Sequence, residues 1–244
     1  MTKEFAERID AVLSAKTVSQ LRRISFRVFR AMGFRRMAYV HSVAGHPEHF
    51  FIDQVGFSQG FATRYTASRR QLDDPFPTIA RRSAVPVLWS RFGRHPDLAK
   101  RHKQYLADLR DAETGDGVSV SVSGPSGKDG YFALGYGCYG PAPSDRELAE
   151  LQLICQAIHN CLCDLTKHSE EKPIALSNRE AQVLHWISRG KANSVIAEIL
   201  GISRHTVDTL SKRIFAKLGV NDRVSAAVLG LKTGMVPHNA SGTE

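Results

Sequence analysis

A polar segment near residue 170 divides the hydrophobic pattern of the chain into two unequal parts. The run Thr166-Lys-His-Ser-Glu-Glu-Lys-Pro173 contains no periodic apolar residue and ends in a proline, which resists helix continuation. A chain of 244 residues is long enough to form two hydrophobic cores. The sequence therefore predicts a domain over residues 1–166, a linker over residues 167–174 and a second domain over residues 175–244.

The segment after this linker contains the start and stop signals of four short helices. Ser177 and Glu180 have the spacing of a capping box, in which each side chain bonds the backbone N–H of the other residue. Gly190 and Gly201 are stop signals. The expected N-terminal caps are Ser177, Asn193, Ser203 and Asn221. In the second helix, the residues expected to face inward are Ile196, Ile199 and Leu200.

The third of these helices has two distinct faces. Its apolar stripe consists of Val207, Leu210, Ile214 and Leu218. The other side shows two polar rows with a spacing of four residues, namely Arg204, Asp208, Lys212 and His205, Thr209, Arg213. A short helix, a glycine-containing turn and a longer helix with an exposed polar stripe are typical of a helix-turn-helix, whose second helix enters the major groove of DNA. Basic side chains on that helix neutralise phosphates, and residues near its N-terminus reach base edges.

The charge of the chain favours the same partner. The sequence has 33 Lys and Arg against 24 Asp and Glu, a net charge of +9, and residues 175–236 contribute +5 of it. This excess favours nucleic acid over a membrane surface. No apolar run approaches the roughly 18 residues of a membrane-spanning helix, and the N-terminus lacks the features of a signal peptide. We therefore expect a cytoplasmic protein that does not bind membranes.

The first 166 residues show interleaved helical and strand periods. Strands are expected at Arg36–Val43, His49–Val55 and Pro86–Trp89. Strict alternation in residues 117–122, followed by a turn and residues 131–139, indicates a hairpin, and Ser144 begins a long helix. These signals predict an α/β/α sandwich with a mainly antiparallel sheet, followed by the C-terminal four-helix helix-turn-helix domain.

Three potential metal ligands share one face of the long helix. Cys155, His159 and Cys163 are spaced by four residues, but no C-x-x-C pair accompanies them. Small buried side chains on an amphipathic helix have the same pattern. We therefore expect these residues in the core, and we expect neither a metal nor a cofactor.

The C-terminal domain resembles the LuxR-type helix-turn-helix over its whole length. The matching residues are dispersed over the four helices and include Glu180, Gly190, Lys191, Ile202, Lys217 and Val220. The resemblance implies sequence-specific binding to an inverted-repeat operator in double-stranded DNA by a homodimer, with RNA polymerase as a further partner. The candidate DNA-binding residues are Lys191, Ser203, Arg204, His205, Thr206, Asp208, Thr209, Lys212 and Arg213.

Residues 60–90, with a later glycine that begins a strand, resemble the signal-binding domain of LuxR-type quorum-sensing regulators. The family pattern W-x-x-x-Y, D-P, Trp and Gly corresponds to Phe61, Tyr65, Asp74-Pro75, Trp89 and Gly117. The resemblance implies an acyl-homoserine lactone as the ligand. Asp74 would accept from its amide N–H, Tyr65 would donate to its amide carbonyl, and Trp89 would pack against the lactone ring. Taken singly, Asp74 before a proline is also typical of a turn or a helix cap.

Two positions make this expected pocket less polar than in the family. Phe61 lacks the indole N–H that binds the lactone carbonyl in the family, and Gly135, a further candidate ligand-binding residue, stands where many relatives carry a hydroxyl. A buried carbonyl without a partner costs about 1–3 kcal/mol. Three interpretations stay open: a different lactone pose, a signal that is not a lactone, or a signal-independent regulator whose N-terminal domain serves dimerisation or partner sequestration.

An enzymatic function is the alternative from another class. A lactone hydrolase would have to combine Asp74 with one of His41, His46, His49 or His95. The sequence contains neither a G-x-S-x-G elbow nor an H-x-H-x-D-H metal motif, and a single carboxylate without a base is insufficient. We therefore expect no catalytic residues.

Replacement of Phe61 tests whether the family pocket is retained. If it is, Phe61→Trp should restore a hydrogen bond to the lactone carbonyl, a gain of about 0.5–1.5 kcal/mol. The response to acyl-homoserine lactones should rise several-fold, as measured by dose–response curves over short and long acyl chains. A weaker response to the native signal would instead indicate a pocket shaped for another molecule, and flat curves from both proteins would favour the signal-independent interpretation.

Overall fold

The computed structural model of the chain describes residues 2–43, 46–57, 74–92, 99–111, 115–137, 142–166 and 174–236. Two compact units are present, one formed by most of residues 1–168 and the other chiefly by residues 169–244. Each unit contains a buried apolar core of its own. The expected linker over residues 167–174 lies outside the described residues except for Ile174.

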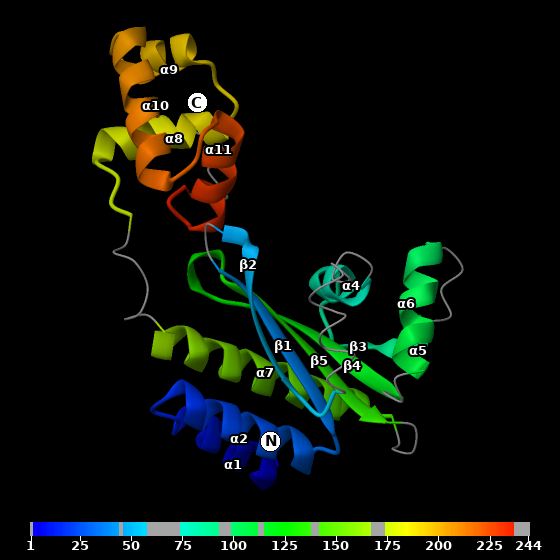
Figure 1. Cartoon of the computed structure of the whole chain (residues 1–244). Coiled ribbons are helices and arrows are strands. Elements are labelled where there is room, and N and C mark those ends of the chain that lie inside the picture. Colours follow the sequence, from blue (N-terminus) through cyan, green and yellow to red (C-terminus); the bar gives the residue numbers. More distant parts are fainter. Residues whose placement is uncertain are drawn as a thin grey trace. The chain divides into compact units, whose positions relative to one another are not determined.

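The described part of the first unit is built on one five-stranded sheet (Figure 1). The strands lie in the order β2 (His46–Val55), β1 (Arg36–Val43), β5 (Asp129–Gly137), β4 (Asp116–Ser123) and β3 (Val87–Leu88). The pairs β1–β5, β4–β5 and β3–β4 are antiparallel. The predicted hairpin is β4–β5, and the short strand β3 ends one residue earlier than predicted because Trp89 begins a helix.

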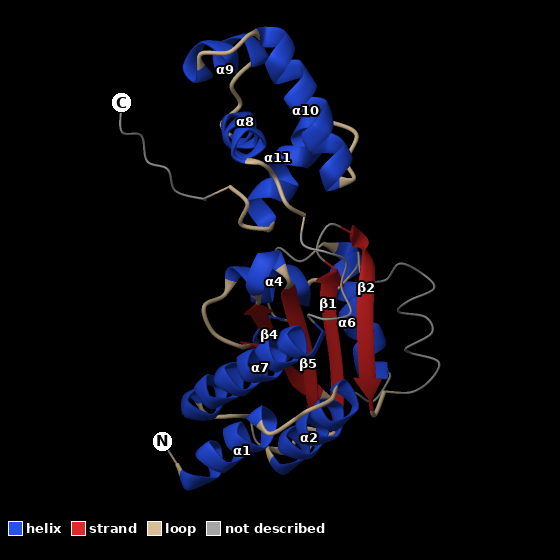
Figure 2. Ribbon diagram, turned by 90° about the vertical axis from the view of Figure 1, so that its left-hand side faces the viewer, coloured by secondary structure: helices blue, strands red, loops and turns tan. Residues whose placement is uncertain are grey.

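Helices cover both faces of this sheet (Figure 2). On one face lie α1 (Lys3–Leu13), α2 (Val18–Ala31) and α7 (Asp145–Thr166), and on the other lie α4 (Phe76–Arg82), α5 (Trp89–Phe92) and α6 (Lys100–Asp111). Val120 and Phe132 of the hairpin join the core beneath the first group, whereas Tyr131 joins a smaller aromatic cluster beneath the second. The predicted α/β/α sandwich is confirmed.

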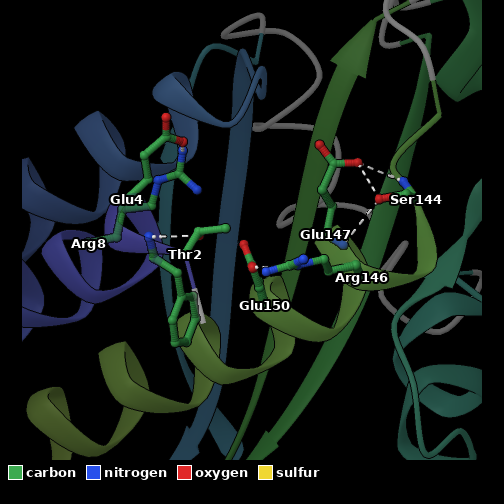
Figure 3. Close-up of polar contacts among 8 residues, drawn as sticks. Thr2, Glu4, Arg8, Ser144, Arg146, Glu147 and Glu150 are labelled. Carbon is green, nitrogen blue, oxygen red and sulfur yellow. Dashed lines mark hydrogen bonds and ion pairs between the residues drawn. The ribbon is translucent and has the colours of Figure 1, made fainter.

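Side chains at the starts of α1 and α7 cap these helices (Figure 3). Thr2 Oγ accepts from the N–H of Phe5, and Ser144 and Glu147 accept from each other's backbone N–H groups. Acid–base pairs one helical turn apart, such as Arg146 with Glu150 at 3.3 Å, follow in both helices. Ser144 therefore starts the long helix at the predicted position.

Within residues 174–236, the second unit consists of α8 (Asn178–Ser188), α9 (Asn193–Leu200), α10 (Arg204–Leu218) and α11 (Arg223–Lys232). The capping box of Ser177 and Glu180 is present, and Ser203 Oγ accepts from the N–H of Thr206 at the start of α10. The four-helix prediction is confirmed.

Three predicted details of this unit are wrong. Ala192 holds the N-cap position of α9, and Asp222, one residue after Asn221, caps α11 by accepting from the N–H of Ser225. Ile199 is 44% exposed because the inward face of α9 is centred on Ile196, Ala197 and Leu200, from which Ile199 is rotated by about 100° around the helix axis.

A fully buried histidine joins α7 to the β4–β5 hairpin. His159 Nε2 lies 2.7 Å from the carbonyl oxygen of Lys128, to which it must donate, so Nδ1 accepts from the hydroxyl of Tyr39 at 2.6 Å. Gly130 leaves room for the ring, since a Cβ there would lie 2.8 Å from Nδ1. Burial lowers the pKa of His159 below its ordinary value. Cys155 and Cys163 are also buried, as predicted.

The lowered pKa predicts that the first unit loses stability in acid. The unfolded chain protonates His159 near pH 6.5, whereas the folded unit protonates it only at lower pH. Between these two pKa values the unfolded state binds more protons, so the free energy of unfolding falls as the pH is lowered. His159→Gln should lower the free energy of unfolding at neutral pH by about 1–3 kcal/mol. It should also remove the part of the pH dependence of that free energy that comes from His159. Urea unfolding followed by Trp89 fluorescence in a Trp186→Phe background measures both effects, and parallel pH profiles for parent and variant would contradict the assignment.

Candidate signal pocket and DNA-binding surface

Aromatic side chains gather on the face of the sheet covered by α4, α5 and α6. Phe76 stacks on Trp89 with ring centroids 5.5 Å apart and ring planes at 29°. Tyr105 and Leu109 of α6 and Tyr131 of β5 complete the buried cluster. Of this group, only Trp89 is a candidate ligand-binding residue from the sequence. The sequence also predicts a helix over Asp97–Leu109, which corresponds to α6. The four-residue spacing of Tyr105 and Leu109 is a signal that these two residues share a buried face of that helix.

Asp74 lies at this cluster with only 7% of its surface exposed. Its Oδ1 accepts from the N–H of Phe76 at 2.9 Å, and its Oδ2 accepts from the hydroxyl of Tyr105 at 3.1 Å. The carboxylate therefore fixes the start of α4 and joins it to α6. A carboxylate has about four acceptor positions, so one that holds these helices can also accept from a ligand.

A chain of buried hydrogen bonds orients Trp89. Its indole N–H donates to Ser119 Oγ at 2.8 Å, and that oxygen lies 2.8 Å from the hydroxyl of Tyr131. Because the indole N–H is used within the protein, the ring can offer a ligand only a packing surface. This is the kind of contact expected for Trp89.

Two glycines lie opposite each other where β4 and β5 pair. Gly117 and Gly135 are register partners, and both are at least partly buried. A Cβ on Gly117 would lie 2.6 Å from the Trp89 ring and 2.5 Å from the carbonyl oxygen of Leu134. Gly117 is therefore required for the close approach of Trp89 to the sheet.

The structure brings only some of the candidate ligand-binding residues together. Asp74 and Trp89 both contact Phe76, and Gly117 packs against Trp89. Phe61 and Tyr65 lie outside the described residues. His41 is one of the histidines that a lactone hydrolase could use. The centroid of its ring lies 5.6 Å from that of Tyr39, which belongs to the core on the other face of the sheet. That position separates His41 from Asp74.

A separate cavity of about 800 Å³ lies near the starts of α1 and α7 (Figure 3). Its apolar lining includes Phe34 and Leu151, which belong to the core opposite the Asp74 cluster. Its charged lining is already paired internally, Arg8 with Glu4 and Arg146 with Glu150. The cavity is therefore distinct from the candidate signal pocket.

In the second unit, α10 has the predicted division into a buried and a polar face. Val207, Ile214 and Leu218 are buried, and Leu210 is partly buried. Thr209 and Asp208 are partly exposed. The exposed candidates are Lys191, Ser203, Arg204, His205, Thr206, Lys212 and Arg213.

Asp208 differs from the other candidates because its carboxylate is bonded within the unit. The side-chain amide of Asn193 donates to it at 2.7 Å, and the Arg223 guanidinium donates to Asn193 Oδ1 at 2.8 Å and to the carbonyl of Lys191. This network joins the starts of α9 and α11 to α10. The sequence does not predict this network, because an asparagine at a helix start is typical of a cap, whereas Asn193 bonds to another helix.

A second polar contact fixes α10 against α8. Lys217 Nζ lies 2.6 Å from Glu180 Oε2, and only 5% of the Glu180 side chain is exposed. The Lys217 ammonium, together with the N–H of Ser177, lowers the pKa of Glu180. One carboxylate therefore both caps α8 and holds the C-terminal part of α10.

Both units match known protein families. Residues 17–162 match the autoinducer binding domain, and residues 175–229 match the luxR family of bacterial regulatory proteins. The first match alone spans more than half of the chain. The chain belongs to the LuxR family. It is a transcription regulator that combines an autoinducer-binding domain with a LuxR-type DNA-binding domain.

Individual proteins show the same relationship at low sequence identity. The transcriptional activator AhyR of Aeromonas hydrophila is 28% identical over 184 residues, 72% of this chain and 69% of AhyR. The y4qH protein of Sinorhizobium fredii is 27% identical over 68% of this chain, and the match spans about half of y4qH, 53%. Escherichia coli SdiA has the same fold, with a TM-score of 0.73 at 18% identity over 96% of this chain and 99% of SdiA. Another SdiA structure, with octanoyl-rac-glycerol, has a TM-score of 0.70 at 18% identity over 98% of this chain and 99% of that one.

Proposed function

We propose that this LuxR-family protein binds an inverted-repeat operator as a homodimer and that an acyl-homoserine lactone in the first unit controls its DNA binding. The main support is that one chain contains both family domains, with an exposed basic face on α10. We also propose residues 1–166, 167–174 and 175–244 as signal-binding domain, linker and DNA-binding domain.

On the DNA side, α10 would lie in the major groove. Lys191, Arg204, Lys212 and Arg213 would contact phosphates, as their exposure and charge favour. The exposed N-terminal part of α10, with Ser203, His205, Thr206 and Thr209, would lie near base edges and phosphates. The bonds of Asp208 to Asn193 favour a role in orienting α10 over direct base contact.

Exposed apolar side chains on α11 support the homodimer. Val224 and Val228 lie one turn apart and are 71% and 47% exposed. A two-fold axis through this face would bury both pairs and place two α10 helices on successive half-sites of an operator. RNA polymerase is the proposed further partner of the DNA-bound dimer, and DNA binding also supports a cytoplasmic location.

On the signal side, Asp74 would accept from the amide N–H of the ligand while Trp89 packs against its ring. The remaining proposed ligand contacts are Phe61, Tyr65, Gly117 and Gly135. Asp74 and Trp89 both contact Phe76, so one ligand can meet both. The octanoyl group bound in an SdiA structure supports an acyl chain as part of the signal. Binding would require neither a catalytic group nor a cofactor.

The absence of an indole donor at position 61 favours a second candidate function. In that case the protein regulates transcription without a signal, and its first unit serves dimerisation or sequestration of a partner. The unfolding temperature distinguishes the two functions, because a ligand that binds only the folded state raises it. An acyl-homoserine lactone should raise the unfolding temperature only if the protein binds it.

The DNA-binding proposal predicts different effects for phosphate and base contacts. A duplex of about 18–20 base pairs that carries an inverted repeat should bind the dimer. Lys212→Gln or Arg213→Gln should weaken binding to all sequences and reduce the slope of log K against log salt by about one for each phosphate that is no longer neutralised. Thr209→Ala should also change the preferred sequence. Equal binding of one half-site by a monomer and of the full repeat by the dimer would contradict the proposal.

The signal-binding proposal predicts that Asp74→Asn damages the response to an acyl-homoserine lactone. The amide oxygen can still accept from the N–H of Phe76, but the charged acceptor for the ligand is removed, which should cost about 1.5–3 kcal/mol. Lactone-dependent reporter expression measures the response. The fragment of residues 175–236, which does not contain position 74, should still bind DNA, and Asp145→Asn, at the exposed start of α7, provides a matched control. An unchanged response in the Asp74 variant would remove this residue from the site.

A further inference from the structure

The strongest local excess of positive charge in the chain lies in the first unit, outside the helix-turn-helix. Residues 11–43 contain seven Lys and Arg and no Asp or Glu, a net charge of +7. Residues 175–236 reach +5, and the whole chain reaches +9. Residues 61–110 contain eleven Lys and Arg against four Asp, also a net charge of +7. The stretch over residues 11–43 therefore differs from the other basic parts of the chain in containing no acidic residue.

Helix α2 presents much of this charge on one side. Arg23, Arg27 and Arg30 are exposed and lie at i, i+4 and i+7, on the side away from buried Leu21 and Val28. The stripe is about 10 Å long, given a rise of 1.5 Å per residue. We call these three residues the α2 arginine stripe.

The stripe differs from an ordinary solvated helix face. On α1 and α7, basic residues are paired with acids one turn away, as in Lys3–Glu7, Arg8–Glu4 and Arg146–Glu150. Helix α2 contains no acidic residue, and within the part of the chain that the structure describes the three arginines of the stripe form no ion pair. Like charges at this spacing repel one another and slightly destabilise the helix, so the pattern is better explained by an external polyanion.

We propose that the α2 arginine stripe is a second DNA-contacting surface, which binds the phosphate backbone without reading sequence. Arginine suits this role because its guanidinium forms paired hydrogen bonds to phosphate oxygens. A stripe of about 10 Å matches roughly three phosphates on one strand, at 3.4 Å of helix axis each.

DNA is favoured over other polyanions because the second unit already brings it close. Eleven residues separate the end of α7 at Thr166 from the start of α8 at Asn178, a reach of at most about 40 Å. Duplex that extends beyond the operator is then present at high effective concentration around the first unit. The proposal rests on DNA binding by the second unit, which the experiment tests separately.

The test compares two variants of the full chain in which the same amount of charge is removed. The first is Arg23→Gln/Arg27→Gln/Arg30→Gln, and the control is Lys100→Gln/Arg101→Gln/Lys103→Gln, three exposed residues of α6 on the other face of the sheet. Binding to a random-sequence duplex of about 60 base pairs is measured by fluorescence anisotropy between about 50 and 200 mM salt. Equal thermal unfolding temperatures establish that both variants fold.

The stripe variant should bind at least tenfold more weakly than the parent, with the slope of log K against log salt reduced by up to about three per protomer. The control should keep the parental slope. Equal slopes in stripe variant and parent, or equally weakened binding in both triple variants, would overturn the proposal. So would loss of binding to phosphatidylserine vesicles with DNA binding intact, which would assign the stripe to a lipid surface. A Lys212→Gln/Arg213→Gln variant with unchanged DNA affinity would contradict the helix-turn-helix assignment alone.

Discussion

The alternation of side chains along the β4–β5 hairpin assigns one face of the sheet to the larger core and the other face to the candidate signal pocket. Val118, Val120 and Phe132 point into the larger, mainly apolar core, whereas Ser119 and Tyr131 point to the opposite face and bond to each other. A shift of pairing by one residue would exchange these two sets. The β4–β5 register therefore determines both which face of the sheet packs against α1, α2 and α7 and which face packs against Trp89.

Carboxylates with two functions connect the elements on which recognition depends. Asp74 fixes the start of α4 and bonds α6, and Glu180 caps α8 and pairs with Lys217 of α10. In both cases one partner is local in sequence and the other is distant. Replacement of Asp74 would break two buried hydrogen bonds, at about 1–3 kcal/mol for a buried donor that loses its acceptor. The geometry of each candidate site is therefore tied to the folding of the unit that contains it.

Features that depend on local spacing could be predicted from the sequence. Contacts between residues that are far apart in the sequence could not. The hairpin, the capping box of Ser177 and Glu180 and the buried stripe of α10 follow from spacing alone, and the structure contains them. Asn193 has the local signature of a cap, yet its amide lies between Asp208 and Arg223, an arrangement that only the packing of three helices creates. Tyr105 bonds Asp74 across 31 residues, and no local pattern predicts that contact. The ligand-binding roles proposed for Asp74 and Trp89 rest on the family resemblance, since no local pattern in the sequence indicates them.

The position of Asp74 also constrains how a signal can act. Among the described residues, the α4–α6 layer packs on the smaller aromatic cluster, and the Asp74–Tyr105 bond joins the start of α4 to α6. The opposite face of the sheet packs on the larger, mainly apolar core. A ligand that donates to Asp74 and packs on Trp89 would add contacts to the less extensively packed layer. Because a ligand specific for the folded state stabilises it by RT ln(1 + [L]/Kd), such contacts would raise the free energy of unfolding of the first unit. Control of DNA binding through the order of α4–α6 then requires no rearrangement of the apolar core, which can serve as the rigid base for the unit.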